Sequence, residues 1–417
     1  MSTLSLPDPL RPAPGGLKGR LMALLMPFAM ETLLPLGFRV LRALPGNRRL
    51  FGIVVATRYD EVREAFLNDP DFRVPYLQKL DVIMGNEPFF LGMEDTPDYR
   101  RDTAAMRRVV RIEDIANLKV KVEAEGERIV AAAGGRLEVV DALVRQITFD
   151  IYRDYFGVTD PPEGDLRVFA TRLFEFQFAD AGNDPELRKE VDVMAPALRR
   201  HIDMLMAERR RSGQLGDDVL GRCLAMNAKG EDGFKDAQIR SSLMGFIVGG
   251  PPQPPMVVPQ AMEQLLRRPE ALAGAQAAAR ANDDKALAGF VFEAMRFDPL
   301  APALPRTATR DSRLAAGTRR EVAVKKEGTV YVAFASAMMD ERRVPEPSVF
   351  NPRRLPHEYI HFGYGLHQCF GIHLNLALLP LMLKPLLKRQ NLRRAPGKDG
   401  HLVKRGAFAD KLWVEYE

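Results

Sequence analysis

The sequence has few cysteines and no long uncharged apolar run. Its two cysteines, Cys223 and Cys369, are too few for a disulfide framework, so we expect a reducing cytoplasm. No uncharged run reaches the ~18 residues that a membrane-spanning helix needs. The 60 basic and 55 acidic residues are too evenly balanced to indicate nucleic-acid binding. Because 46% of the residues are hydrophobic, the chain can bury a large core, and we expect a monomeric globular protein.

The first 49 residues form a segment of their own. Residues 21–30 (LMALLMPFAM) and 32–38 (TLLPLGF) are apolar and flank Glu31. This segment contains prolines and no small-residue cleavage site, which argues against a signal peptide. We predict a short amphipathic segment packed on the domain, with a weak contact to a membrane surface as the alternative.

The rest of the chain is predicted to be mainly α with a smaller β-rich region. Residues 50–57 resemble a strand and 58–69 an amphipathic helix, and most of 112–229 has a helical pattern, including 195–213. The C-terminal third contains short β-branched runs between Pro-rich loops. With no internal repeat and no long linker, we predict a single domain over 50–417.

Residues 249–255 read GGPPQPP between two segments that look helical, 236–248 and 256–268. Each proline inside a helix removes a backbone donor and costs about 3 kcal/mol, so we predict a helix break here. Pro259 is tolerated if a second helix begins near Met256, since first-turn amides need no intrahelical partner. A Pro-rich ligand for another domain is the weaker alternative because the flanks are apolar.

Four of the six histidines, His357, His361, His367 and His373, surround Cys369. A structural zinc site usually needs paired cysteines, whereas this cysteine stands alone among glycines and precedes an apolar helix. A thiolate at a helix N-terminus can bind iron. The pattern therefore favours a haem lying across the loop, with Cys369 as its axial ligand.

Residues 362–371 (FGYGLHQCFG) resemble the haem loop of the cytochrome P450 family, in which phenylalanine, two glycines, a basic residue, the cysteine and a last glycine recur at this spacing. The resemblance implies the P450 fold over roughly residues 50–410. It also implies haem b as cofactor, Cys369 as metal ligand, and Phe362 and Gly363 beside the haem.

Three further matches follow the family's order. Glu293 and Arg296 resemble its Glu-x-x-Arg pair, and Arg354 in FNPRRL resembles the arginine that joins this pair. The resemblance implies a structural ion network for these three residues. It also implies that Arg306 and His367 bind the haem propionates, since anions need donors.

The chain departs from the family at its central helix. Gly249 and Gly250 occupy the small positions, but Pro252 replaces the acid and Gln253 the threonine of the usual proton relay. Gln253 can position a water or a substrate oxygen but does not titrate. The alternatives are that the bend only shapes the pocket, or that water or a substrate group carries the proton.

A second departure concerns the haem propionates. Where the family often has a histidine and an arginine four residues later, this chain has Tyr99 and Thr103. We expect Arg101 or Arg107 to compensate.

The resemblance implies a haem-thiolate oxidoreductase acting on a hydrophobic small molecule that is lipid-, terpenoid- or polyketide-like. The missing relay favours peroxide or substrate-hydroperoxide chemistry. One alternative is an ordinary monooxygenase with a separate ferredoxin or flavodoxin-type electron donor. Another is a haem-binding sensor or carrier without turnover. Cys223, in a helical pattern, is predicted to be a packing residue.

Overall fold

The computed structural model describes residues 29–47, 49–50 and 52–417. Helices predominate and short strands form small sheets, as the sequence predicts. The contacts divide the chain into two compact units, each built from segments that are distant in sequence. The described residues of the first unit are 76–256 and 373–386, and those of the second are 29–75, 257–372 and 387–417, without 48 and 51. The single domain expected over 50–417 stays a prediction.

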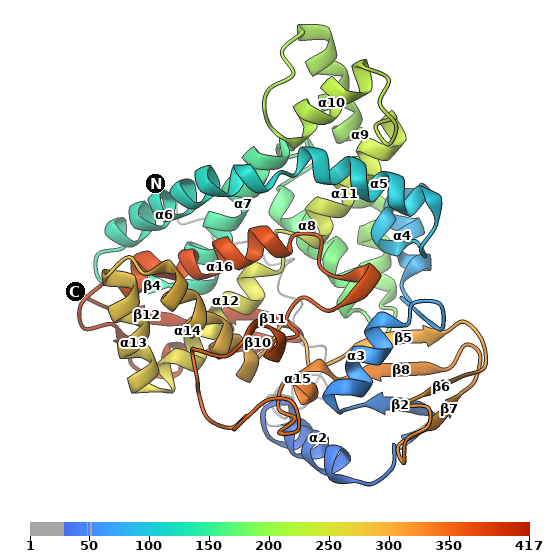
Figure 1. Cartoon of the computed structure of the whole chain (residues 1–417). Coiled ribbons are helices and arrows are strands. Elements are labelled where there is room, and N and C mark those ends of the chain that lie inside the picture. Colours follow the sequence, from blue (N-terminus) through green and yellow to red (C-terminus); the bar gives the residue numbers. More distant parts are fainter. Residues whose placement is uncertain (1–28, 48, 51) are drawn as a thin grey trace. The chain divides into compact units, whose positions relative to one another are not determined.

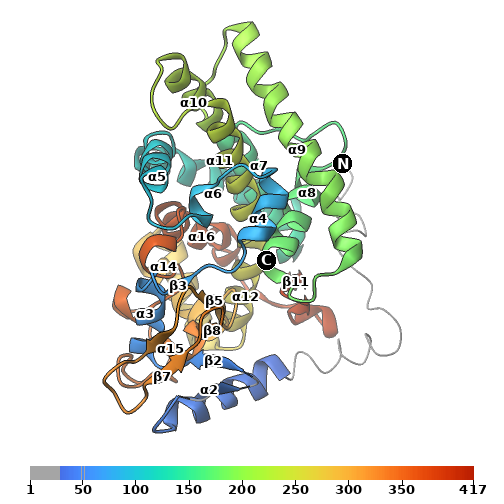
Figure 2. The same cartoon turned by 90° about the vertical axis from the view of Figure 1, so that its right-hand side faces the viewer.

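The first unit is almost entirely helical. The long helix α9 (Pro185–Ser212) packs against α4 (Leu77–Met84), α8 (Leu166–Phe174) and α11 (Asp236–Gly249), as Figure 2 shows. Its other elements are α5 (Pro97–Val109), α6 (Ile115–Ala132), α7 (Gln146–Phe156), α10 (Val219–Ala228), the short helices η3 (Phe90–Gly92), η4 (Ile112–Asp114), η5 (Val139–Arg145) and η6 (Glu175–Ala179), and β4 (Arg136–Glu138).

The second unit contains a five-stranded sheet. The strand order is β1 (Arg49–Leu50), β2 (Ile53–Ala56), β8 (Thr329–Val332), β5 (Leu304–Ala308), β3 (Phe72–Arg73). β2 pairs with β8 in parallel and β5 with β8 antiparallel, and the three strands lie side by side in Figure 1. Helix α3 (Tyr59–Leu67) packs against β2 and β8 and shares their apolar core.

The remaining elements of the second unit are mostly short. They are η2 (Ala29–Leu33), α2 (Leu34–Ala43), α13 (Pro269–Arg280), α14 (Asp284–Phe297), α15 (Phe334–Ala337), η7 (Pro356–Glu358), η8 (Gly365–His367), η9 (Lys398–Gly400), and the strands β6 (Ser312–Leu314), β7 (Val322–Val324), β9 (Arg393–Arg394), β10 (Val403–Arg405), β11 (Phe408–Lys411) and β12 (Trp413–Glu415). Two helices, α12 (Pro254–Leu266) and α16 (Ile372–Leu387), have residues in both units.

Two helix boundaries differ from the sequence prediction. α9 starts at Pro185 and includes Pro196, so the chain tolerates a proline inside this long helix. α12 starts at Pro254, which places Pro259 in its second turn and not in its first. Prolines are tolerated at 254 and 255 because the first amides of a helix have no intrahelical acceptor. The missing N–H groups of these prolines therefore cost no hydrogen bond.

Part of the predicted N-terminal segment, residues 1–28 and 48, lies outside the described residues. In α2, Phe38 is buried, and Arg42 Nη1 donates to Ser336 Oγ over 2.8 Å. The side chains of Leu36 and Val40 on the same helix are exposed. Within the described ranges, no helix is both long and apolar enough to cross a bilayer.

Candidate functional site

The cysteine loop, residues 360–372, folds back on itself in the second unit. Gly363 and Gly365 adopt φ angles of +67° and +74°, a left-handed conformation that favours glycine. The loop closes where Cys369 N donates to Phe362 O over 3.0 Å. Ile372 N then donates to Cys369 O over 3.2 Å, just where α16 begins. The half-buried Cys369 therefore precedes a helix, as the sequence predicts.

The end of α3 lies behind this loop. A methyl group on Gly365 would come within 2.7 Å of Phe66 O, so no larger residue fits without moving the backbone. A methyl group on Gly363 would make an ordinary contact of 3.8 Å with the Phe66 ring. Gly365 is therefore required by close packing as well as by its φ angle.

Arg306 lies in β5, opposite Val330 of β8, and its side chain belongs to the buried face of the strand. Its guanidinium lies over the Phe66 ring, 5.0 Å from the centroid, and Nη1 donates to Pro305 O over 3.0 Å. Phe66 thus links Arg306 to the glycines of the cysteine loop. A buried arginine of this kind is a donor for an anionic group.

His367 lies next to a carboxylate that the sequence analysis missed. Its Nε2 is 3.7 Å from Asp69 Oδ1, and Asp69 Oδ2 accepts from Leu366 N over 3.3 Å. Asp69 therefore holds the cysteine loop from a residue just after α3. Nothing in the local pattern around Asp69 indicates this contact, which spans almost 300 residues.

The structure brings Glu293, Arg296 and Arg354 together in a buried network. Glu293 Oε1 accepts from Arg296 Nη2 over 2.7 Å and from Arg354 Nε over 3.1 Å. Two residues not identified from the sequence join it: Arg354 Nη1 donates to Glu358 over 2.8 Å, and Tyr359 Oη donates to Glu293 over 3.2 Å.

Electrostatics stabilise the charged form of this network. Burial alone would lower the pKa of Arg354, but its hydrogen bonds to Glu358 and Glu293 outweigh burial and raise it. Burial and the negative charge of Glu293 raise the pKa of Tyr359. Each of these groups bonds to at least one other member, which is the arrangement that the predicted structural network requires.

His361, within the cysteine loop, is a half-buried neutral imidazole. Its Nε2 donates to Phe292 O over 3.0 Å, and its ring stacks on Tyr359 with centroids 5.2 Å apart. Burial lowers its pKa to about 4. In the described part of the chain, no three His, Cys, Asp or Glu side chains form a group that could hold a metal ion.

In the first unit, α11 ends at Gly249, and residues 250–253 are non-helical before α12 begins at Pro254. Gly250 N donates to Phe246 O over 2.9 Å, and a methyl group on Gly250 would lie 2.7 Å from that same oxygen. A methyl group on Gly249 would meet no described atom within 4 Å. The side-chain amide of Gln253 donates to Gly249 O.

The alternative prediction, that the prolines of residues 249–255 form a ligand for another domain, is wrong. Pro251, Pro252, Pro254 and Pro255 are all buried, so they cannot serve as a peptide ligand for another domain. The predicted helix break, in contrast, is confirmed by the gap between α11 and α12.

Tyr99 and Arg101 both lie on α5. Arg101 forms ion pairs with Asp98 and Asp102 of the same helix, at 2.5 and 2.8 Å. The hydrogen bond to Asp102 is the largest influence on the pKa of Arg101, which is raised. The guanidinium of Arg101 is thus already bonded to two carboxylates. That Arg101 binds a haem propionate stays a prediction.

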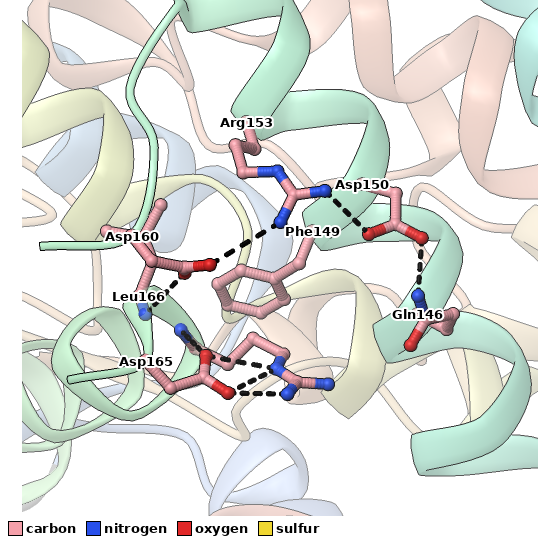
Figure 3. A pocket seen from close by; sticks show the side chains of 8 residues that line it. Gln146, Phe149, Asp150, Arg153, Asp160, Asp165 and Leu166 are labelled. Atoms are coloured by element: carbon pink, nitrogen blue, oxygen red, sulfur yellow. Dashed lines mark hydrogen bonds and ion pairs between the residues drawn. The ribbon is translucent and has the colours of Figure 1, made fainter. Parts of the chain in front are cut away.

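A separate cavity of about 260 Å³ lies in the first unit, beside α7 and the start of α8 (Figure 3). Its charged side chains pair with one another. Arg153 lies 3.3 Å from Asp150, and Arg167 donates to Asp165 over 2.9 Å. Burial raises the pKa of Asp150. The cavity contains none of the residues predicted for the functional site.

The residues of the cysteine loop suit a haem. A cysteine before a helix can supply a thiolate ligand, the left-handed glycines at 363 and 365 let the loop turn tightly before it, and Arg306 supplies a donor for an anion.

Comparisons with known proteins agree with this chemistry. The cytochrome P450 family model matches residues 166–407. A cytochrome P450, 107B1, of Saccharopolyspora erythraea is 24% identical over 360 residues, 82% of this chain and 83% of that protein. The bifunctional dioxygenase–epoxy alcohol synthase of Pyricularia oryzae is 36% identical over 121 residues, 29% of this chain, and the chain spans 10% of that protein's length.

The fold is also shared with solved structures. The structure of CalO2 superposes with a TM-score of 0.78 at 20% identity, over 93% of this chain and 97% of that one. The family model covers more than half of the chain and includes the cysteine loop. The chain therefore belongs to the cytochrome P450 family, whose members are oxidoreductases that hold haem b through a cysteine thiolate.

Proposed function

We propose that this haem-thiolate enzyme isomerises or dehydrates a hydroperoxide of a hydrophobic small molecule, with a lipid-like compound as the first candidate and terpenoid- or polyketide-like compounds next. Such a reaction uses oxygen that is already reduced. It needs neither external electrons nor protons delivered by the protein.

The break after α11 is the observation that carries this proposal. Prolines stand at 251 and 252, and the one polar side chain of the break, Gln253, does not titrate. The usual acid and alcohol of the family are therefore absent from these positions. A chain without this relay has no acid at these positions to deliver the protons that O₂ activation needs, whereas a hydroperoxide brings its own hydroxyl proton.

We assign the residues as follows. Cys369 would ligate the iron, Arg306 and His367 would bind the propionates, and Phe362 and Gly363 would lie beside the ring. A thiolate-bound haem iron, when present, supplies the electron donation that favours O–O cleavage. Gln253 accepts a hydrogen bond from the substrate's hydroperoxide, and the small Gly249 leaves space for that substrate.

The partial similarity to the fungal epoxy alcohol synthase supports this chemistry, since that protein's name describes a rearranged product. A second fungal protein, the Psi-producing oxygenase A of Emericella nidulans, is 37% identical over 102 residues, 24% of this chain and 9% of that protein.

The second candidate is an ordinary O₂-dependent monooxygenase with a separate ferredoxin or flavodoxin-type donor. Its support is the similarity along most of the chain to a bacterial P450. Under this alternative the bend only shapes the pocket, and a water carries the proton. The non-catalytic sensor considered from the sequence is not retained, since the family and its relatives are enzymes.

Isotope labelling separates the two candidates. We would supply a fatty-acid hydroperoxide with ¹⁸O in both peroxide positions, in unlabelled water and air. Isomerisation predicts a product that keeps both ¹⁸O atoms, and dehydration one that keeps one ¹⁸O and gains no ¹⁶O. A product that contains one ¹⁶O from air and forms only with NAD(P)H and a reductase would contradict the proposal.

A further inference from the structure

The helix break fixes the orientation of the Gln253 side chain. Its amide lies against Gly249 O and forms a hydrogen bond with it. A carbonyl oxygen only accepts hydrogen bonds, so the amide nitrogen of Gln253 must be the atom that faces it. The amide cannot be flipped without two oxygens facing each other.

Gly249 O is available because of the prolines. In a continuous helix it would accept from the backbone N–H of residue 253. Here Gln253 N donates to Gly250 O over 3.2 Å, and Met256 N donates to Gln253 O over 2.9 Å as α12 begins. The side chain of Gln253 therefore replaces its own backbone amide as the partner of Gly249 O.

The oxygen of the same amide is left as an acceptor. Among the described residues, none donates a hydrogen bond to Gln253 Oε1, and the side chain is only half-buried. A methyl group on Gly249, four residues before Gln253, would meet no described atom within 4 Å outside its own helix and chain neighbours. An unpaired, half-buried acceptor is suited to a ligand that donates.

We infer that the break holds Gln253 as a fixed hydrogen-bond acceptor, so that this site selects ligands with a neutral O–H group. The terminal hydroxyl of a hydroperoxide is the donor that the reaction offers, and in this respect the inference rests on the proposed function. The C-terminal end of α11 carries partial negative charge, which disfavours an anion at the same place. An ether or a ketone can accept from the second N–H of the Gln253 amide but has no donor for Oε1, so it makes one hydrogen bond fewer than an alcohol.

The test uses two unreactive ligands that differ in one donor. A long-chain secondary alcohol carries the O–H, and its methyl ether does not, while neither contains an O–O bond. Dissociation constants for both are measured on the haem-loaded protein by absorbance titration and by calorimetry. Because one hydrogen bond to a neutral group is worth about 1 kcal/mol, the wild type is expected to bind the alcohol roughly five- to tenfold more tightly.

Three variants locate the effect. Gln253→Leu removes the acceptor and should bring the ratio of the two dissociation constants to about one. Gln253→Asn keeps an amide that is one methylene shorter, so it loses the bond to Gly249 O and should lose most of the preference. Gln276→Leu is the control, since Gln276 is also half-buried and its amide also donates to a carbonyl, Arg389 O, at 3.1 Å. This control should keep the wild-type ratio.

The outcomes are distinct. An unchanged ratio in Gln253→Leu would overturn the inference, and an unchanged ratio in Gln253→Asn would overturn the part played by Gly249 O. If the alcohol preference is present but the labelled hydroperoxide is not converted, the proposed function fails and the acceptor site stands. Conversion without any preference would leave the proposed function standing and contradict this inference.

Discussion

Among single residues, His361 should make the free energy of unfolding depend on pH. Its pKa is about 4 in the folded protein because of burial, against about 6.5 for an ordinary histidine. Unfolding therefore takes up a proton at acid pH, so the stability is present above pH 6.5 and is lost as the pH falls toward 4. The difference corresponds to roughly 3 kcal/mol, of which about 2 kcal/mol is lost between pH 7 and pH 5.

Denaturant unfolding at pH 7 and pH 5 measures this contribution. His361→Phe keeps an aromatic ring and should remove that part of the loss in the free energy of unfolding. His401→Gln, at an exposed position, is the control and should keep the wild-type dependence. A pH dependence in His361→Phe equal to that of the wild type would show that other groups cause it.

The two cysteines should differ in every assay of the haem. Cys223 is buried and its pKa is raised to about 12 by burial, so it is an inert packing residue, as the sequence predicts. Cys223→Ala should leave the absorbance of the reduced carbon-monoxide complex unchanged. Cys369→Ser should lose the red-shifted band that a thiolate ligand produces. A variant without Cys369 that retained this band would move the iron ligand elsewhere.

Among the elements, the end of α11 contains two glycines whose replacement should affect the free energy of unfolding differently. A methyl group on Gly250 would lie 2.7 Å from Phe246 O, a backbone atom that cannot easily move. Gly250→Ala should therefore lower the free energy of unfolding by roughly 1–3 kcal/mol. Gly249→Ala is the matched comparison, since its methyl group would meet no described atom, and it should be no less stable than the wild type. Equal losses in thermal or urea unfolding would contradict this account of the break.

The network that joins α14 to the segment before the cysteine loop should be structural. Removing Glu293 would leave Arg296 and Arg354 buried without their shared carboxylate, at a cost of about 3–5 kcal/mol. We expect Glu293→Ala to yield little folded haem protein, whereas Glu270→Ala, at the exposed start of α13, should yield normal amounts. Normal yield and spectrum with altered turnover in Glu293→Ala would instead indicate a catalytic role.

How far the sequence predicts these elements depends on whether the determining contacts are local. The cysteine loop, the pairing of Glu293 with Arg296 and the break at 249–255 follow from neighbouring residues, and each is present in the structure. Asp69, which bonds to the loop after Leu366, is close only in the folded chain. Pro196 obscures the first half of α9.

For the whole molecule, composition predicts the class of protein but not its location or its partners. The mainly helical fold agrees with the expectation from the sequence. The predicted weak contact with a membrane surface stays a prediction, with the exposed Leu36 and Val40 of α2 as the residues to test. A cytoplasmic location, a monomeric state and a separate electron donor also stay predictions.

The central claim, that this P450 uses a hydroperoxide and not O₂, is tested most directly by comparing oxidants on one enzyme preparation. Steady-state rates are measured with a fatty-acid hydroperoxide alone, and with the parent fatty acid, O₂, NAD(P)H and a surrogate reductase chain. The account predicts the faster turnover with the hydroperoxide, and a lower rate in Gln253→Leu. Tightly coupled product formation from O₂ and NAD(P)H, with no conversion of the hydroperoxide, would contradict it.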